Sequence, residues 1–371
     1  MHRILNRLAG LLAVLALVVL PARAAHATVT IKLATLAPEG STWHKALVKM
    51  GEEWSEISHG EVQLKIYAGG VVGNETVMLR KMRIGQLHAG AFTNIGLMEI
   101  DPSSQVLNTP MLIRNYGELD YVMKTMKPEF EKRIEDKGYV VLGWSDVGWA
   151  HLFSKEKITD PSQRGQLKIF AWEGDPAAVE MYQAAGFKPV VVAATDVVPS
   201  LQSGLIDSFP LPPLAALAQQ WFGLAPNMLD VPWAPLLGAT IINKSAWESI
   251  PEQYRPALME SARSNGQAIQ AAVRRQDKKA VTVMEKYGLH VNKVDRATEH
   301  KWADIAKLTY PVVRNKMVSP EIFDHVQGLV ETYRKEHPDE STQDPSMPSQ
   351  PQNAGQDGGS AAPDKSEATS P

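Results

Sequence analysis

Short alternating runs and amphipathic stretches follow one another through most of the chain. Apolar residues at every second position predict strands near 29–33 and 62–66, and short apolar runs predict further strands near 87–93, 139–144, 152–153, 167–170, 190–192 and 206–209. Apolar residues at helical spacing predict helices over 43–57, 75–84, 176–185 and 196–203, each followed by a glycine. Strands that alternate with helices indicate an α/β fold with mainly parallel sheets.

The last third of this pattern is different. From about 251 to 336 the spacing is nearly all helical, with breaks near Gly288 and before Pro320. We expect a two-lobed clamshell with a helical C-terminal third. Lobe I is predicted at 28–143 and lobe II at 144–234. A crossover strand and helices at 235–337 are predicted to pack across both lobes. A ligand between the lobes would lie beyond the carboxyl ends of the strands, and hinge closure around it is expected.

Both ends of the chain have a composition that sets them apart. Residues 1–27 have the pattern of a secretory signal peptide, with Arg3 and Arg7 before an apolar run over 8–20 and a small-residue cleavage site at 25–27. The run is shorter than the about 20 residues that a membrane-spanning helix needs, so a retained anchor is the weaker alternative. We therefore predict a periplasmic protein. The tail over 338–371 is rich in Pro, Ser, Gln, Asp and Gly, which is typical of a disordered segment.

Composition excludes several classes of function. The chain has no cysteine, which rules out a lipid-anchored start, disulfides, thiolate metal sites and cysteine nucleophiles. Its formal net charge is −3, and it has no basic block of the kind that nucleic-acid binding requires. No ligand spacing or dense oxygen cluster favours a metal ion, and no cofactor is expected.

Four segments, in this order, carry a family resemblance. They are the strand TIKLAT at 30–35 with its loop to Trp43, the glycine turn GGVVGNE at 69–75, the segment QSGLID at 202–207, and the segment DVPW at 230–233. Together they resemble the periplasmic substrate-binding proteins of tripartite ATP-independent periplasmic (TRAP) transporters, over about residues 28–330. The resemblance implies that the two lobes form a periplasmic-binding-protein clamshell. It also implies capture of a small-molecule ligand, delivery to a two-component membrane permease, and no catalysis.

One position departs from that family in a way that bears on the ligand. The arginine that clamps the ligand's carboxylate usually ends a strand reading Lys-Ile-Arg, and here the strand reads Lys168-Ile169-Phe170. An upstream Gly-x-Arg is replaced by glycine, tryptophan and alanine at 148–150. Without an arginine, a buried carboxylate costs several kcal/mol, whereas apolar burial gains about 25 cal/mol per Å2. We therefore expect a hydrophobic or amphipathic ligand. Binding of an organic acid by other donors or a cation is the alternative.

The candidate ligand-binding residues are mostly aromatic. They are Trp43, Asn94, Trp144, Trp149, Phe170, Trp172, Glu173, Phe209 and Trp233. Each also has a structural interpretation, because aromatic side chains often fill a core and polar ones often face solvent. An exported hydrolase is a rival function, but the segment GWSDV at 143–147 breaks the G-x-S-x-G pattern and no H-E-x-x-H is present. A sensor domain or scaffold with the same fold is a further alternative.

Overall fold

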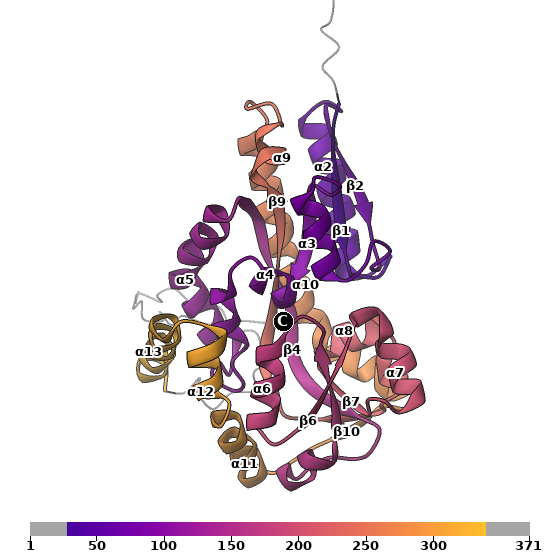
Figure 1. The fold of residues 1–371 in the computed structure, drawn as a ribbon, viewed down its shortest axis with the longest axis vertical. Coiled ribbons are helices and arrows are strands. Elements are labelled where there is room, and N and C mark those ends of the chain that lie inside the picture. The colour runs from indigo at the N-terminus through magenta and orange to yellow at the C-terminus, as the bar shows by residue number, and fades with distance from the viewer. Residues whose placement is uncertain (1–27, 339–371) are drawn as a thin grey trace, which may run out of the picture.

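The computed structural model describes residues 28–338, so the predicted signal peptide and nearly all of the predicted tail lie outside the described residues. The described chain forms a mixed sheet whose main path runs β2-β1-β3-β9-β4-β7-β5-β6, with β8 and β10 attached beside β4. Helices cover the sheet in two lobes, as Figure 1 shows. This arrangement confirms the predicted α/β, two-lobed architecture.

Lobe I is built on three parallel strands. β1 (Val29–Thr35) pairs with β2 (Val62–Tyr67) on one side and with β3 (Ala89–Thr93) on the other. Helices α2 (Thr42–Ile57), α3 (Glu75–Arg83) and α4 (Asn94–Met98) follow the strands in turn. The alternation predicted for β1 buries Ile31 and Leu33, which share a core cluster with Leu47, Met50 and Trp54 of α2. Burial of one face of each element therefore fixes how α2 lies on the sheet.

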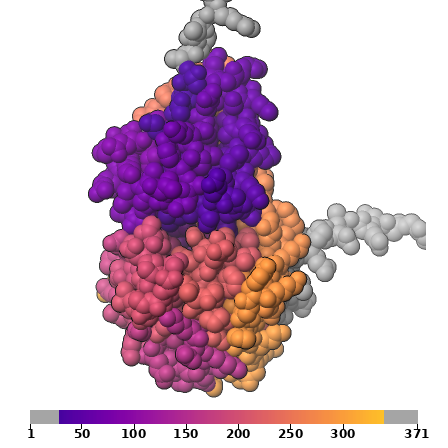
Figure 2. Space-filling model, turned by 90° about the vertical axis from the view of Figure 1, so that its right-hand side faces the viewer, coloured from indigo at the N-terminus to yellow at the C-terminus, as the bar shows by residue number. Residues whose placement is uncertain are grey.

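Lobe II repeats the parallel arrangement. β5 (Lys168–Trp172) pairs with β6 (Lys188–Val192) and β7 (Ser208–Leu211), and β8 (Asn227–Leu229) pairs with β10 (His290–Asn292). Helices α6 (Pro176–Ala184), α7 (Val197–Ser203) and α8 (Pro213–Ala218) belong to this lobe. In Figure 2 the indigo and purple residues of lobe I rest on the magenta to red residues of lobe II.

Two antiparallel strands join the lobes. β4 (Tyr139–Ser154) is one continuous strand where the sequence predicts two, at 139–144 and 152–153. Its first part, up to Ala150, pairs with β9 (Ala234–Asn243), and its last four residues pair with β7. The pairing of β4 with β9 shifts register twice, the second time at Gly148, whose φ of 122° suits glycine. The sheet is thus parallel within each lobe and antiparallel where the lobes meet.

The remaining helices of the described chain lie at different places around the two lobes. They are α5 (Tyr116–Asp136), α9 (Lys244–Glu248), α10 (Arg255–Lys286), α11 (Arg296–Lys307), α12 (Tyr310–Val312) and α13 (Pro320–Glu336). The long helix α10 contacts α2 of lobe I, α8 of lobe II and β4 between them. Among residues 28–338, no helix has the length and apolar character needed to cross a membrane.

Candidate ligand cavity

A cavity of about 180 Å3 lies between the lobes. The last residues of four parallel strands reach its wall, namely Thr35 of β1, Thr93 of β3, Trp172 of β5 and Leu211 of β7. Ligands of α/β sheets bind beyond the carboxyl ends of the strands, and here the strand ends of both lobes point at one space. The middle of β4 adds Ser145 and Val147 to the wall. The sheet topology therefore positions this cavity.

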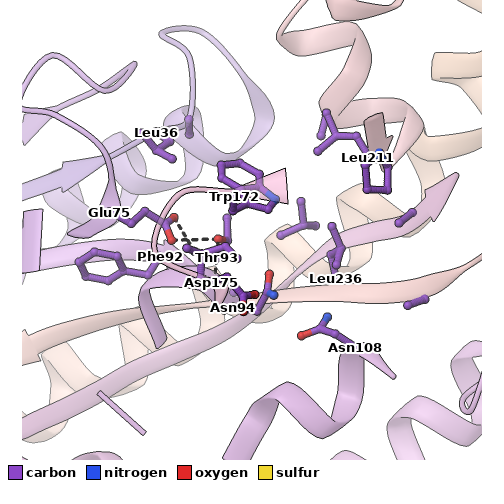
Figure 3. Close-up of a pocket in the computed structure, with 18 of the residues that line it drawn as sticks. Leu36, Glu75, Phe92, Thr93, Asn94, Asn108, Trp172, Asp175, Leu211 and Leu236 are labelled. Atoms are coloured by element: carbon purple, nitrogen blue, oxygen red, sulfur yellow. Dashed lines mark hydrogen bonds between the residues drawn. The ribbon is translucent and has the colours of Figure 1, made fainter. Parts of the chain in front are cut away.

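Most of the wall is apolar. Its larger apolar side chains are those of Leu36, Trp43, Phe92, Ile95, Val147, Trp172, Met181, Tyr182, Leu211, Trp221, Trp233, Leu236 and Met317. In the view of Figure 3, Glu75, Thr93 and Asp175 lie on one side of the cavity together with Leu36 and Phe92, and Leu211, Leu236 and Asn108 lie on the other. Polar groups are thus spread through a mainly apolar wall.

Three amides provide neutral hydrogen-bonding groups. The side chain of Asn94 donates to Gln105 Oε1 at 3.3 Å, and Gln105 Nε2 donates back to the Asn94 carbonyl at 3.2 Å. Asn108 Nδ2 donates to the Pro235 carbonyl at 2.6 Å. Within residues 28–338, the side-chain oxygens of Asn94 and Asn108 accept no hydrogen bond, so both can receive one from a ligand.

Two carboxyl groups reach the cavity, and both are held by backbone donors. Glu75 accepts hydrogen bonds from the Thr93 backbone N–H at 2.8 Å, the Thr93 hydroxyl at 2.9 Å and the Gly96 N–H at 2.6 Å. Burial nevertheless raises the pKa of Glu75 to about 7. Asp175 caps α6 by accepting from the Ala178 N–H at 2.8 Å, and burial raises its pKa as well. None of the described lining residues is a lysine, arginine or histidine.

Four of the predicted ligand residues line this cavity: Trp43, Asn94, Trp172 and Trp233. A fifth, Glu173, is exposed at its edge, where it accepts a hydrogen bond from Asn74 Nδ2 of lobe I at 3.0 Å. The structure therefore brings together five of the nine residues, from α2, α4, β5, the turn after β5, and the segment before β9.

Phe170 and Phe209 lie behind the cavity wall, not on it. Both are fully buried in the core of lobe II. The ring of Phe170 lies 4.9 Å from that of Trp172 and 6.1 Å from that of Trp221, and the ring of Phe209 lies 5.5 Å from that of Trp221. Alternation along β5 explains this, because Trp172 and Phe170 share one face of the strand and Trp172, at its end, covers Phe170. The position expected for a ligand arginine instead supports two tryptophans of the wall.

Trp144 and Trp149 of β4 also lie outside the cavity wall. Trp144 packs against Phe130 of α5, and its Nε1 donates to Glu131 at 3.1 Å. Trp149 is 2% exposed and its ring lies 5.8 Å from that of Tyr116. Both face α5, a helix that the sequence analysis did not predict, so nothing indicated a packing partner for this side of β4.

Several wall residues escaped the sequence analysis. Trp221 lies in a short 3-10 turn, and Gln105 and Asn108 lie in another over Pro102–Asn108, so no periodic pattern marked them. Leu36 directly follows the first strand, and Tyr182 lies on the helix after β5. The position of Leu36 next to a strand end was the one signal that could have found any of them.

The model of the family described as bacterial extracellular solute-binding protein, family 7, matches residues 33–316. The chain belongs to this family. The predicted resemblance to TRAP substrate-binding proteins is thereby confirmed. A solute-binding protein of Roseobacter denitrificans is 27% identical over 268 residues, which cover 70% of this chain and 80% of that protein. The C4-dicarboxylate-binding periplasmic protein of Rhodobacter capsulatus is 22% identical over 290 residues, which cover 77% of this chain and 86% of that protein.

Solved structures show the same fold. A TRAP periplasmic solute-binding protein from Ralstonia eutropha, with bound (S)-2-acetolactate, superposes with a TM-score of 0.76 at 19% identity, covering 82% of this chain and 99% of that one. The Roseobacter denitrificans protein itself, with bound L-galactonate, gives a TM-score of 0.73 at 22% identity. The match covers 82% of this chain and 99% of that one. The family and these relatives are solute-binding proteins, so the fold is one used for binding.

Proposed function

We propose that this protein is the periplasmic solute-binding component of a TRAP transporter and that it binds an uncharged, mainly apolar or amphipathic ligand. The family supports the first part, with delivery to a membrane permease as the implied step. The cavity supports the second part. Its wall is mostly aromatic and aliphatic, and the described lining residues include no cationic side chain.

Charge decides between ligand classes. The two relatives with solved structures hold acetolactate and galactonate, which are both acids. In this chain, a carboxylate in the cavity would be buried near Glu75 and Asp175 without a cation to offset its desolvation, which costs several kcal/mol. An apolar ligand that buries on the order of 200 Å2 gains about 5 kcal/mol gross at 25 cal/mol per Å2. An uncharged ligand is therefore favoured.

The hydrogen-bonding groups of the wall define the other half of the ligand. The free side-chain oxygens of Asn94 and Asn108 are acceptors, so they suit a hydroxyl or amide donor. A ligand with one hydrogen-bonding group and an aliphatic or aromatic body would match this wall. A cavity of about 150 Å3 is enough to hold benzene, so the volume here suits a small molecule.

Binding of an organic acid remains the second candidate, because the relatives favour it. Neutral donors would have to replace the arginine. The amide nitrogens of Asn94, Gln105 and Asn108 each donate one bond within the protein and keep a second N–H for a ligand. Neutral hydrogen bonds offset less of the desolvation of a carboxylate than a charge-assisted bond does, so the uncharged ligand stays favoured.

The first test is to recover the protein from the periplasm of cells that express the full chain and to record native mass spectra. Any released adduct is then identified. A long-chain or aromatic neutral adduct supports the proposal, and a small polar acid overturns it. Loss of uptake of that compound on deletion of the gene tests the transport role.

A matched pair of probes tests charge directly. Titration calorimetry with 1-hexanol and hexanoate at pH 8 compares an alcohol with an acid of the same chain length. We expect the alcohol to bind at least about tenfold more tightly. Trp172→Ala, in the wall, should weaken binding of 1-hexanol about tenfold. Trp144→Ala, on the α5 side of β4, is the control and should leave it unchanged.

A further inference from the structure

A second, smaller cavity of about 20 Å3 lies in lobe II behind the ligand cavity. We call it the inner cavity. Its wall comes from one face of the lobe II sheet, from α6 and α11 and from the segments next to them, and it consists of Leu152, Ile169, Tyr182, Phe187, Pro210, Leu229, Val231, Trp233 and Trp302. Apart from the phenol oxygen of Tyr182 and the indole nitrogens, these side chains are apolar. A void with such a wall is dry and accepts apolar groups.

Three side chains separate the inner cavity from the ligand cavity. Tyr182, Pro210 and Trp233 line both spaces. Pro210 directly precedes Leu211 on β7, but their side chains point to opposite faces, and Leu211 lines the ligand cavity alone. The inner cavity therefore adjoins the ligand cavity at the three shared side chains.

Trp233 is the largest of the three, and its backbone is fixed. Its N–H donates to the Ala150 carbonyl at 2.8 Å, and its own carbonyl accepts from the Met111 N–H at 2.7 Å. Its ring packs edge-on against Phe187 and Trp302, at 6.2 Å from each. The backbone bonds do not depend on the side chain, so a smaller residue at 233 would join the two cavities without moving the strand.

We propose that Trp233 sets the longest apolar chain that the ligand site accepts, by closing the inner cavity against the ligand. This inference rests on the proposed function, since it requires an apolar ligand. Once the indole is removed, the inner cavity and the space of the indole become available to the ligand's end. Trp233 is then a specificity-determining residue, and the inner cavity is an extension of the site for additional methylene groups.

Straight-chain primary alcohols from 1-butanol to 1-decanol are suitable probes, with affinities measured by calorimetry. In the wild type, we expect the affinity to rise about fourfold per methylene up to a limiting length and then to stop rising. In Trp233→Ala the limit should move by about two carbons, which gives the longest alcohols roughly a tenfold gain over the wild type. An unchanged limit overturns the proposal.

Two further variants separate a joined cavity from a merely larger one. Leu211→Ala enlarges the ligand cavity alone, because Leu211 does not line the inner cavity. Leu211→Ala should not lengthen the longest alcohol that gains affinity as Trp233→Ala does. An equal shift in that chain length for the two variants overturns the proposal. Val231 lines only the inner cavity, so adding Val231→Leu to Trp233→Ala fills the extension. This double variant should return the limit toward the wild-type length.

Folding is checked by thermal unfolding of each variant. If Trp233→Ala does not fold, Trp233→Leu removes less volume and serves as the test, with a shift of about one carbon expected. If the wild type binds the alcohols and no variant moves the limit, the inference fails while the proposed function stands. If no alcohol binds either protein, the proposed apolar ligand fails, and the inference fails with it.

Discussion

Trp43 of lobe I donates from its indole Nε1 to the backbone carbonyl of Asp146 on β4, at 3.1 Å. Its ring also packs against the core clusters of lobe II and α8. The carboxylate of Asp146 is held in turn by Arg274 of α10, whose Nε lies 2.7 Å away and whose terminal nitrogens bind Asp120 of α5. Trp43 thus connects lobe I to the strand that joins the lobes, at the cavity wall.

Replacement of this tryptophan by phenylalanine should weaken ligand binding. Trp43→Phe keeps an aromatic ring in the wall but removes the bond to Asp146, a loss of about 1 kcal/mol. We expect the affinity for the tightest-binding alcohol to fall roughly fivefold, measured by calorimetry. Trp54→Phe is the matched control on the same helix, because its Nε1 donates to the Leu258 carbonyl at 3.1 Å, away from the cavity.

The control separates closure of the lobes from stability. Trp54 is fully buried, so Trp54→Phe should lower the free energy of unfolding by about 1–2 kcal/mol and leave the affinity unchanged. Equal effects of the two variants on affinity would mean that the bond from Trp43 has no specific part in holding the lobes around a ligand.

Elements with a clear period could be predicted from the sequence. β1 and α2 agree with the predicted ranges within two residues, because their buried faces repeat at every second position or at helical spacing. The continuity of β4 could not be foreseen. Gly148 and the polar residues 145–146 interrupt its apolar pattern, and the strand continues only because β9 and then β7 pair with it.

The site could be predicted only in part, for a similar reason. A sequence shows that Phe170 and Trp172 end the same strand, but whether each faces the cleft depends on what packs over it. Trp221 comes from a distant turn and covers Phe170, leaving Trp172 at the surface of the cavity. The absence of an arginine at 170 was visible in the sequence. The absence of any other cation from the wall required the structure.

Arginine at position 170 should not restore a carboxylate site. Phe170 is fully buried between Trp172, Trp221 and the core, so Phe170→Arg places a charge in an apolar cluster. We expect a loss of about 3–5 kcal/mol in the free energy of unfolding, seen in urea titrations. Phe170→Leu, which keeps the site apolar, should lose about 1 kcal/mol. Tighter binding of hexanoate by a folded Phe170→Arg would contradict this view.

Glu173 should contribute little to binding although it bridges the lobes. Its bond to Asn74 at 3.0 Å is exposed to solvent, where such interactions are worth about 0–1 kcal/mol. Glu173→Ala is therefore expected to change the alcohol affinity less than about fivefold. Glu180 of α6 is an exposed carboxylate that pairs with Lys316, and Glu180→Ala is the control for loss of one surface carboxylate. A tenfold or larger effect of Glu173→Ala alone would assign it a direct part in closing the lobes.

Stability should fall as the pH rises from about 4.5 to 7. Burial raises the pKa of Glu75 from 4.5 to about 7 and that of Asp277 from 3.8 to about 7. Between the unfolded and folded pKa values the native state binds more protons than the unfolded chain. The stabilisation is thus fully present below the unfolded pKa and is lost by the folded pKa. For Glu75 the loss is on the order of 3 kcal/mol, at about 1.4 kcal/mol per pKa unit.

Asp277→Asn isolates one of these two groups. Asp277 of α10 accepts from the Leu214 N–H at 3.0 Å, and an asparagine keeps one carbonyl oxygen for that donor. Urea unfolding at pH 5, 6, 7 and 8 should show a shallower decline for Asp277→Asn than for the wild type, because one titrating carboxyl is gone. Asp304→Asn, at an exposed carboxylate, should leave the slope unchanged. Equal slopes for the wild type and Asp277→Asn would mean that Asp277 is ionised in the folded protein throughout this range.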